Sequence, residues 1–214
     1  VNYMRENKKV INPSGHATDL FSDWSAEFIR ERKKSKDPFF LFLSYNAPHT
    51  PIQPPKEWTA KVMKREKGIT QQRAKLVALI EHMDEGIGRV LSAIEEKDNT
   101  IVIFTSDNGG QANVGARNHP WRGEKQQMWE GGIRVPACIV WPGKVKGGSK
   151  YSGDSMSMDW MPTLMDIVGA KKNELLDGVS LWPGIQGKDD SNNQERTLLW
   201  VRREGGTRYG GQDY

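Results

Sequence analysis

The expected fold is decided by residues Thr100 to Pro136, TIVIFTSDNGGQANVGARNHPWRGEKQQMWEGGIRVP. The segment begins with Ile101-Val102-Ile103-Phe104, an apolar and mostly β-branched run that predicts a strand buried on both faces. The run ends in Asp107-Asn108-Gly109-Gly110, where a carboxylate and a carboxamide precede two glycines that allow a sharp turn. In open α/β sheets, ligands bind at the carboxyl ends of the strands. We therefore expect this edge to hold a hard metal ion and an oxyanion.

Asp-Asn-Gly-Gly is also the composition of an ordinary structural turn, because Asn and Gly tolerate left-handed backbone angles. A hairpin turn would be followed at once by a second strand. Here the long polar segment from Gln111 to Gly132 follows instead, and long irregular segments within compact domains usually carry function. Arg122, Lys125 and Arg134, around the Gly131-Gly132 turn, are cations that suit an anionic group, although Arg134 fits a structural ion pair better.

A second strand is predicted at Phe39 to Leu43, and it leads into a loop where prolines flank His49. A rigidly held imidazole beyond a strand end can donate a proton to a substrate oxygen or leaving group. A long amphipathic helix, Thr70 to Glu96, separates this strand from the one at residue 101. A strand–helix–strand unit is expected to be parallel and right-handed. We therefore predict that His49 and the Asp107-Asn108 pair lie on the same edge of one sheet.

The remaining pattern predicts a few further elements and no internal repeat. Helices are expected from Thr18 or Asp19 to about Lys34 and from Asp159 to Val168, with Pro162 in the first turn of the second. The Pro- and Lys-rich residues 51–69 are expected to cross the surface. His82 and Asp84 lie within the long helix, and we interpret them as structural. Further strands are expected at Ala137 to Trp141 and at Thr197 to Arg202.

Composition excludes some classes of function. The net charge of +4 comes largely from three Lys- and Arg-rich runs that are expected to be solvated, and no aromatic-interleaved basic stripe indicates nucleic acid. The single cysteine, Cys138, lies in an apolar run, where we expect a buried and inert thiol. No apolar run approaches the roughly 20 residues needed to span a bilayer. The chain begins with Val1 and without a signal peptide, so we interpret it as an internal fragment.

Three motifs together resemble the sulfatases of the alkaline-phosphatase-like superfamily: FFLFLSYNAPHTP, then SDNGG, then GEKQQMWEGGIRVP followed by a strand ending in WPG. The matching motifs extend from about Gly15 to about Gly184. The resemblance implies an α/β fold with a mostly parallel sheet flanked by helices, here incomplete. It implies that residues 1–195 are the C-terminal portion of a catalytic domain and that residues 196–214 begin a truncated subdomain.

The resemblance also implies roles for individual residues. Asp107 and Asn108 match the family's metal ligands. Their oxygens suit Ca²⁺ or Mg²⁺ over Zn²⁺, and with the resemblance we expect Ca²⁺, with Mg²⁺ possible. Lys125 matches the lysine that binds the sulfate, and His49 matches the histidine that contacts the sulfate ester. The family's formylglycine nucleophile, made from Cys or Ser in a C/S-x-P-x-R motif, is expected upstream, because residues 1–214 contain no such motif.

Other residues of the loop suit a sugar. Asn118, His119, Trp121 and Arg122 lie between the metal motif and Lys125, and we take His119 and Arg122 as candidate substrate-binding residues. A tryptophan in such a loop is equally often a packing anchor.

The leading prediction is a metal-dependent sulfuric ester hydrolase acting on a small-molecule or carbohydrate sulfate ester, with no nucleic-acid partner and no membrane span. The isolated chain is expected to be inactive, because its nucleophile lies elsewhere. One alternative is a phosphodiesterase or phosphonate monoester hydrolase of the same superfamily. Another is a non-catalytic domain that binds a metal and an anion. The family suggests a periplasmic, secreted or lysosomal location, and the oligomeric state is open.

Overall fold

A computed structural model describes residues 4–95, 99–171, 175–188 and 195–201 of the 214-residue chain. Its contacts divide the chain into two compact units, each of which is described by itself. Unit 1 comprises Val1–Asp98 with Gln111–Arg117, and unit 2 comprises Asn99–Gly110 with Asn118–Tyr214. The predicted boundary between residues 195 and 196 stays a prediction, since residues 202–214 lie outside the described part.

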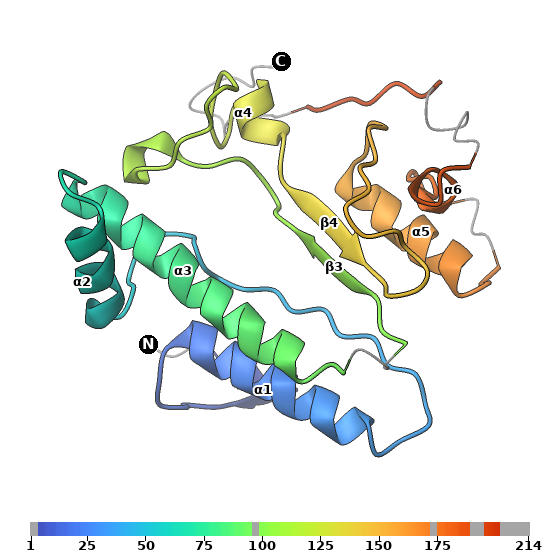
Figure 1. The fold of residues 1–214 in the computed structure, drawn as a ribbon, viewed down its shortest axis with the longest axis horizontal. Helices are drawn as coiled ribbons and strands as arrows, with labels where there is room; N and C mark the ends of the chain where they lie inside the picture. The colour runs from blue at the N-terminus through green and yellow to red at the C-terminus, as the bar shows by residue number, and fades with distance from the viewer. Residues whose placement is uncertain (1–3, 96–98, 172–174, 189–194, 202–214) are drawn as a thin grey trace. The chain divides into compact units, whose positions relative to one another are not determined.

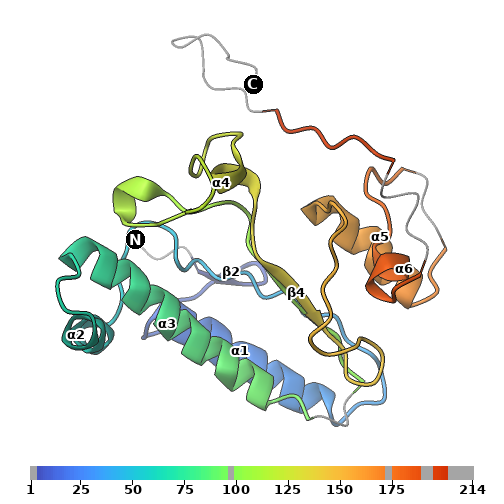
Figure 2. The same cartoon turned by 45° about the horizontal axis from the view of Figure 1, so that its top comes forward.

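Unit 1 is built on two long helices, α1 (Ala17–Arg32) and α3 (Gln71–Ser92), which lie side by side and run in the same direction (Figures 1 and 2). Thr70 caps α3 with its hydroxyl. The predicted cap of α1 was wrong by two residues, because the ring of His16 accepts the backbone N–H of Thr18. Small residues let the helices approach closely, and their shared core is formed by Ala26, Ile29, Val90 and Ala93.

The Pro- and Lys-rich residues 51–69, expected to cross the surface, contain a further helix, α2 (Lys56–Arg65). It packs against α3 through a second small core of Val62, Ala74 and Ala78. The prolines Pro54 and Pro55 stand immediately before the helix, where a missing N–H costs nothing. Unit 1 also contains the short antiparallel pair β1 (Arg5–Glu6) and β2 (Lys9–Val10) and the 3₁₀ turn η1 (Ala112–Val114).

The predicted strand at residues 39–43 was wrong as a hydrogen-bonded element, because the segment is extended but pairs with no strand in the described residues. Its side chains nevertheless alternate as in a strand. Leu41 and Leu43 pack against the core between α1 and α3, whereas Phe40 and Phe42 are 73% and 80% exposed. The segment was therefore correctly recognised as apolar, but within unit 1 only one of its faces is covered.

Unit 2 contains a single antiparallel ladder in its described residues, between β3 (Val102–Thr105) and β4 (Ala137–Val140). Val102 pairs with Val140 and Thr105 with Ala137, so the long segment between the strands leaves and re-enters the ladder at one end. The described residues do not contain the parallel pairing that we predicted. Both strands are partly exposed, and Cys138 on β4 is exposed as well, against the prediction of a buried thiol.

The C-terminal helices of unit 2 are organised around the fully buried carboxylate of Asp159. It lies between the 3₁₀ turn η2 (Ser157–Asp159) and α5 (Trp160–Ile167). Arg196 binds both of its oxygens at 2.6 Å, and the backbone N–H groups of Met156 and Val179 donate to them as well. The same region contains α6 (Trp182–Ile185). No strand occurs in residues 197–201, and residue 202 lies outside the described part.

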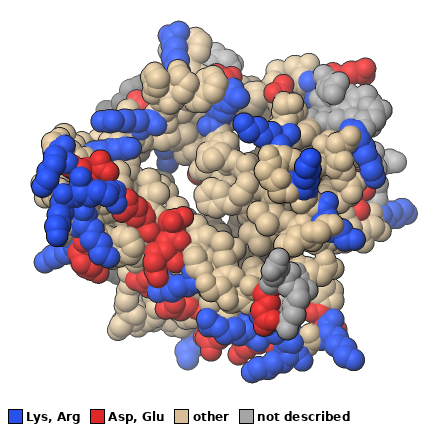
Figure 3. Space-filling view, viewed as in Figure 1, with Lys and Arg blue, Asp and Glu red and all other residues tan. Residues whose placement is uncertain are grey.

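The charged surface matches the sequence expectation. Figure 3 shows Lys and Arg side chains gathered over α2 and the beginning of α3, with Asp and Glu side chains next to them. The lysines and arginines of the three basic runs, residues 30–36, 61–67 and 144–150, are exposed. Among the described residues, no helix combines the length and the apolar character that crossing a membrane requires.

The contact between α1 and α3 predicts opposite effects for two neighbouring glycines. A Cβ on Gly86 would overlap the hydroxyl of Ser22, whereas a Cβ on Gly88 would meet nothing within 4 Å. Gly86→Ala is expected to lower the free energy of unfolding by about 1–3 kcal/mol through overpacking. Gly88→Ala is expected to raise it by about 0.5–1 kcal/mol, since alanine is the better helix former. Urea denaturation measures both, and equal effects would contradict the packing.

The Asp159 carboxylate predicts an acid-sensitive fold. Burial acts to raise the pKa of Asp159, but the hydrogen bonds of Arg196 and the two backbone N–H groups hold that pKa below its ordinary value. The stabilisation is therefore present above about pH 4 and is lost as the pH falls. Asp159→Asn is expected to cost about 3–5 kcal/mol of unfolding free energy at pH 7, because Arg196 loses its counter-ion.

The difference between Asp159→Asn and the parent chain should shrink as the pH falls below about 4. Asp177→Asn, which changes an exposed carboxylate of the same unit, provides the control and should remain close to the parent chain. A pH-independent difference for Asp159→Asn would contradict an ionised carboxylate at this position.

Candidate functional site

The candidate metal ligands lie where β3 ends. Asp107 is exposed and Asn108 is half-buried in the loop that follows Thr105. The amide nitrogen of Asn108 donates to the carbonyl of Gly109 at 3.1 Å, which leaves its side-chain oxygen for another partner. The hydroxyl of Ser106 donates to the backbone carbonyl of Asn108. One carboxylate and one amide oxygen are thus presented by consecutive residues, in a donor set that suits Ca²⁺ or Mg²⁺.

The two glycine pairs of the sequence motifs pack directly against each other. The N–H of Gly109 donates to the carbonyl of Gly132 at 2.9 Å, and the N–H of Gly131 donates to the carbonyl of Arg122 at 2.7 Å. A Cβ on Gly109, Gly131 or Gly132 would strike neighbouring backbone atoms. Glycine is therefore required at these positions because the two backbones approach closely. From the sequence, the need for glycine was explained only by sharp turns. The contact places the short helix α4 (Glu130–Ile133) against the loop after β3.

Asn118 ties the same loop to the segment that carries the predicted cations. Its side-chain oxygen accepts the N–H of Gly110 at 2.9 Å. Its amide nitrogen donates to the carbonyls of Gly110 at 2.8 Å and Gly123 at 3.1 Å. The sequence reading placed Asn118 near a possible sugar, but the structure gives it this bridging role.

Lys125 lies next to the metal motif through its backbone. Its N–H donates to the carbonyl of Gly110 at 3.1 Å, and the residue is half-buried. Gly110 is two residues beyond Asn108, so this hydrogen bond joins the lysine segment to the loop of the candidate ligands. Unit 2 thus brings together two motifs that the sequence predicted to share a site.

The candidate substrate-binding residues His119 and Arg122 are both exposed. The guanidinium of Arg122 lies 3.8 Å from the ring centre of Trp129 in a cation–π contact. Arg134 makes the same contact with Trp121 at 4.1 Å, and it also pairs with Glu130 at 3.1 Å, as predicted for a structural cation. Two stacked guanidinium–indole pairs therefore lie exposed in this segment, and the substrate roles of His119 and Arg122 stay predictions.

His49 belongs to unit 1, where it is exposed. Its Nδ1 lies 2.8 Å from the carbonyl of Thr50, which makes Nδ1 the protonated nitrogen of the neutral ring. Nε2 is then the nitrogen that can accept or carry a second proton. The predicted convergence of His49 with Asp107, Asn108 and Lys125 stays a prediction.

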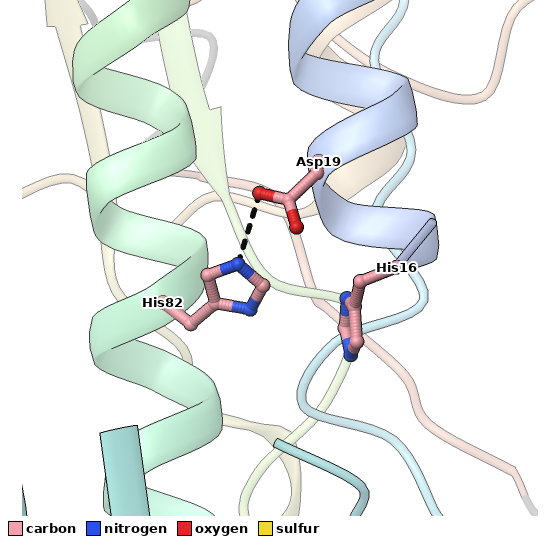
Figure 4. A group of neighbouring side chains, drawn as sticks. All are labelled: His16, Asp19 and His82. Atoms are coloured by element: carbon pink, nitrogen blue, oxygen red, sulfur yellow. Dashed lines mark hydrogen bonds and ion pairs between the residues drawn. The ribbon is translucent and has the colours of Figure 1, made fainter. Parts of the chain in front are cut away.

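The sequence reading missed a cluster in unit 1 formed by His16, Asp19 and His82 (Figure 4). Among the described residues, these are the His, Cys, Asp or Glu side chains that meet in a group of three. His82 was correctly expected to be a structural hydrogen-bonder, since its Nε2 lies 3.0 Å from Asp19. His16 and Asp19 are three residues apart, which hints at one helical face, but no pattern in the sequence connects them with His82.

The profile of the Sulfatase family matches residues 2–170. A sulfatase of Formosa agariphila is 32% identical over 203 residues, which are 86% of this chain and 36% of that protein. Human steryl-sulfatase is 30% identical over 209 residues, which are 90% of this chain and 34% of that protein. The chain thus spans about a third of the length of the curated relatives it matches.

Solved structures also resemble this chain. Ps i-CgsB in complex with k-i-k-neocarrahexaose superposes with a TM-score of 0.78 at 34% identity, covering 86% of this chain and 41% of that one. BT4656 in complex with D-glucosamine-2-N,6-O-disulfate superposes with a TM-score of 0.73 at 20% identity, covering 95% of this chain and 58% of that one. The second likeness concerns the fold alone.

Because Asn118 bridges two segments, we predict that replacing it with the nearly isosteric aspartate loosens the contact between them. Asn118→Asp keeps the acceptor for the N–H of Gly110 but loses the donor to two carbonyls. We expect the unfolding free energy to fall by about 1–3 kcal/mol, as for buried polar groups left unpaired. Amide hydrogen exchange over residues 106–134 should accelerate at the same time. Asn113→Asp adds the same charge at an exposed position and should leave that exchange unchanged.

Proposed function

This chain belongs to the sulfatase family, and we propose that it forms part of the active site of a metal-dependent hydrolase of sulfate esters. Since it spans about a third of its relatives, the activity of a whole protein is part of the proposal. The observation that carries it is the backbone contact between the loop of Asp107 and Asn108 and the segment of Lys125. We infer that the backbone contact brings the Lys125 ammonium near the proposed cation site. A cation and an ammonium group together suit a sulfate, which carries negative charge on several oxygens.

Each proposed residue has a distinct task. Asp107 and Asn108 hold the cation through oxygen atoms, with further ligands supplied from outside this pair. Lys125 neutralises charge on the sulfate as the ester bond breaks. His49, with Nδ1–H held by the carbonyl of Thr50, is the proposed acid: in its doubly protonated form it donates the Nε2 proton to the leaving oxygen and becomes neutral. The proposed nucleophile is a formylglycine outside residues 1–214.

We propose Ca²⁺ as the cation, with Mg²⁺ as the substitute. The loop after β3 fits a hard ion, because its donors are oxygens and because Asn108 uses its amide nitrogen within the loop. When bound, such an ion polarises the sulfuryl oxygens and favours the ionised nucleophile.

We propose a carbohydrate sulfate as the substrate class. Ps i-CgsB, at 34% identity, is known in complex with k-i-k-neocarrahexaose. The exposed stacked pairs of Arg122 with Trp129 and Arg134 with Trp121 offer aromatic and cationic surface of the kind a sulfated sugar contacts. His119 is the further candidate on this loop. For the compartment, the family favours periplasmic, secreted or lysosomal sites.

Binding by the 214-residue chain tests the proposed site. Isothermal titration should detect Ca²⁺, and a sulfated oligosaccharide should bind more tightly in Ca²⁺ than in EDTA. Asp107→Asn is expected to abolish this dependence on Ca²⁺. Lys125→Met should lower the affinity for the oligosaccharide by about 10- to 100-fold, which corresponds to the usual free energy of a charge-assisted hydrogen bond.

Lys150→Met, which removes an exposed lysine of the same unit, is the matched control and should bind as the parent chain does. Equal weakening by both lysine variants would mean that only net charge matters, and the proposed role of Lys125 would be wrong. Aryl sulfate turnover by the chain alone should stay at background, because its nucleophile lies elsewhere. Clear turnover would contradict the assignment of an external formylglycine. A stronger preference for a phosphonate over the sulfated sugar would favour the alternative hydrolase.

A further inference from the structure

The cluster of His16, Asp19 and His82 lies between the start of α1 and the middle of α3, entirely within unit 1. One ligating atom from each residue lies within 4.8 Å of the other two. The two imidazole rings are 4.7 Å apart in an edge-to-face arrangement, and Trp58 lies 5.6 Å from the ring of His82. The group is therefore compact and lined on one side by an aromatic ring.

His82 provides the strongest evidence for a bound ligand in this cluster. The residue is 3% exposed, and its Nδ1 has no hydrogen-bond partner. Nε2 is directed to Asp19, which fixes the neutral tautomer with the proton on Nε2 and a lone pair on Nδ1. Figure 4 shows Nδ1 on the side of the ring that faces His16. A buried lone pair without a donor is costly, and a bound cation would satisfy it.

Asp19 offers a second ligand to the same space. Its Oδ1 receives His82 at 3.0 Å and Arg89 at 2.7 Å, while Figure 4 shows its other oxygen directed toward the gap between the rings.

The surrounding charge favours a cation despite the presence of Arg89. That guanidinium faces three carboxylates, those of Asp19, Asp23 and Glu85, at 2.7, 3.6 and 3.6 Å. One positive group against three negative groups leaves the neighbourhood net negative. His16 contacts the N–H of Thr18 through Nδ1 at 3.2 Å and the carbonyl of Gln53 through Nε2 at 3.0 Å, at the start of α1. Binding a metal ion would replace one of these two contacts.

From these observations we propose that His16, Asp19 and His82 form a binding site for Zn²⁺, or for a similar transition metal, that joins α1 to α3. Two imidazoles and a carboxylate are ligands typical of zinc, whereas the oxygen-only pair Asp107 and Asn108 suits a hard ion. Tetrahedral coordination requires ligand atoms about 3.3 Å apart, which small side-chain rotations reach from the observed spacing. Three protein ligands leave the fourth position to water.

The site is tested with the full 214-residue chain, treated with EDTA and then saturated with Ca²⁺ to occupy hard-ion sites. Calorimetric titration with Zn²⁺ should show one equivalent and should raise the midpoint of thermal unfolding, because zinc binds the folded state. His82→Gln keeps a donor in the position of Nε2 but lacks Nδ1. It is expected to lower the affinity for Zn²⁺ by about 100-fold or more, since the loss of a ligand has a larger effect than the loss of an outer-shell partner.

His119→Gln removes an exposed histidine in unit 2 and should bind zinc as the parent chain does. Unchanged affinity in His82→Gln, equal losses in both variants, or no binding by the parent chain would each overturn the proposal. Should His82→Gln fail to fold, visible absorption of the Co²⁺-loaded parent chain decides instead. Intense tetrahedral bands are expected, and a weak octahedral spectrum would overturn the site.

Discussion

The structure of the candidate sulfatase site depends on one constraint, the direct approach of two stretches of backbone in unit 2. Gly109 and Gly110 lie against the Gly131-Gly132 pair and the Lys125 amide without intervening side chains. Because each contact is made by peptide groups, its geometry is set by chain conformation more than by rotamer choice. Asn118 completes the arrangement by bonding to both stretches. The proposed metal ligands and Lys125 are thus carried by a framework that is built mainly from peptide groups.

Much of this arrangement could be predicted from the sequence, because local signals determine it. The helical periods of α1 and α3, the strands β3 and β4, and the motif at Asp107-Asn108 were each visible in short windows. The resemblance also implied a shared site for Lys125 and the Asp107-Asn108 motif. The backbone N–H of Lys125 does bond to Gly110, but the role of its side chain stays a prediction.

What could not be predicted depends on partners far apart in the chain. The apolar run at residues 39–43 indicated a buried strand, but a hydrogen-bonded neighbour is a property of the sheet and not of the run. The predicted parallel order is not confirmed for the same reason, since residues 39–43 have no hydrogen-bonded strand neighbour among the described residues and β3 pairs antiparallel with β4. The pairing of His82 with Asp19 spans 63 residues, beyond the reach of any periodic pattern. The helix α2 was not predicted, because the prolines that precede it indicated an irregular segment.

The uncovered apolar side chains have a practical consequence. Phe40 and Phe42 present adjacent aromatic rings to solvent in unit 1, and Phe104 and Val140 are partly bare in unit 2. Extended backbone with exposed aromatic groups is the pattern by which chains add to one another edge to edge. We therefore expect any self-association of this chain to begin at these exposed apolar groups and to increase with protein concentration.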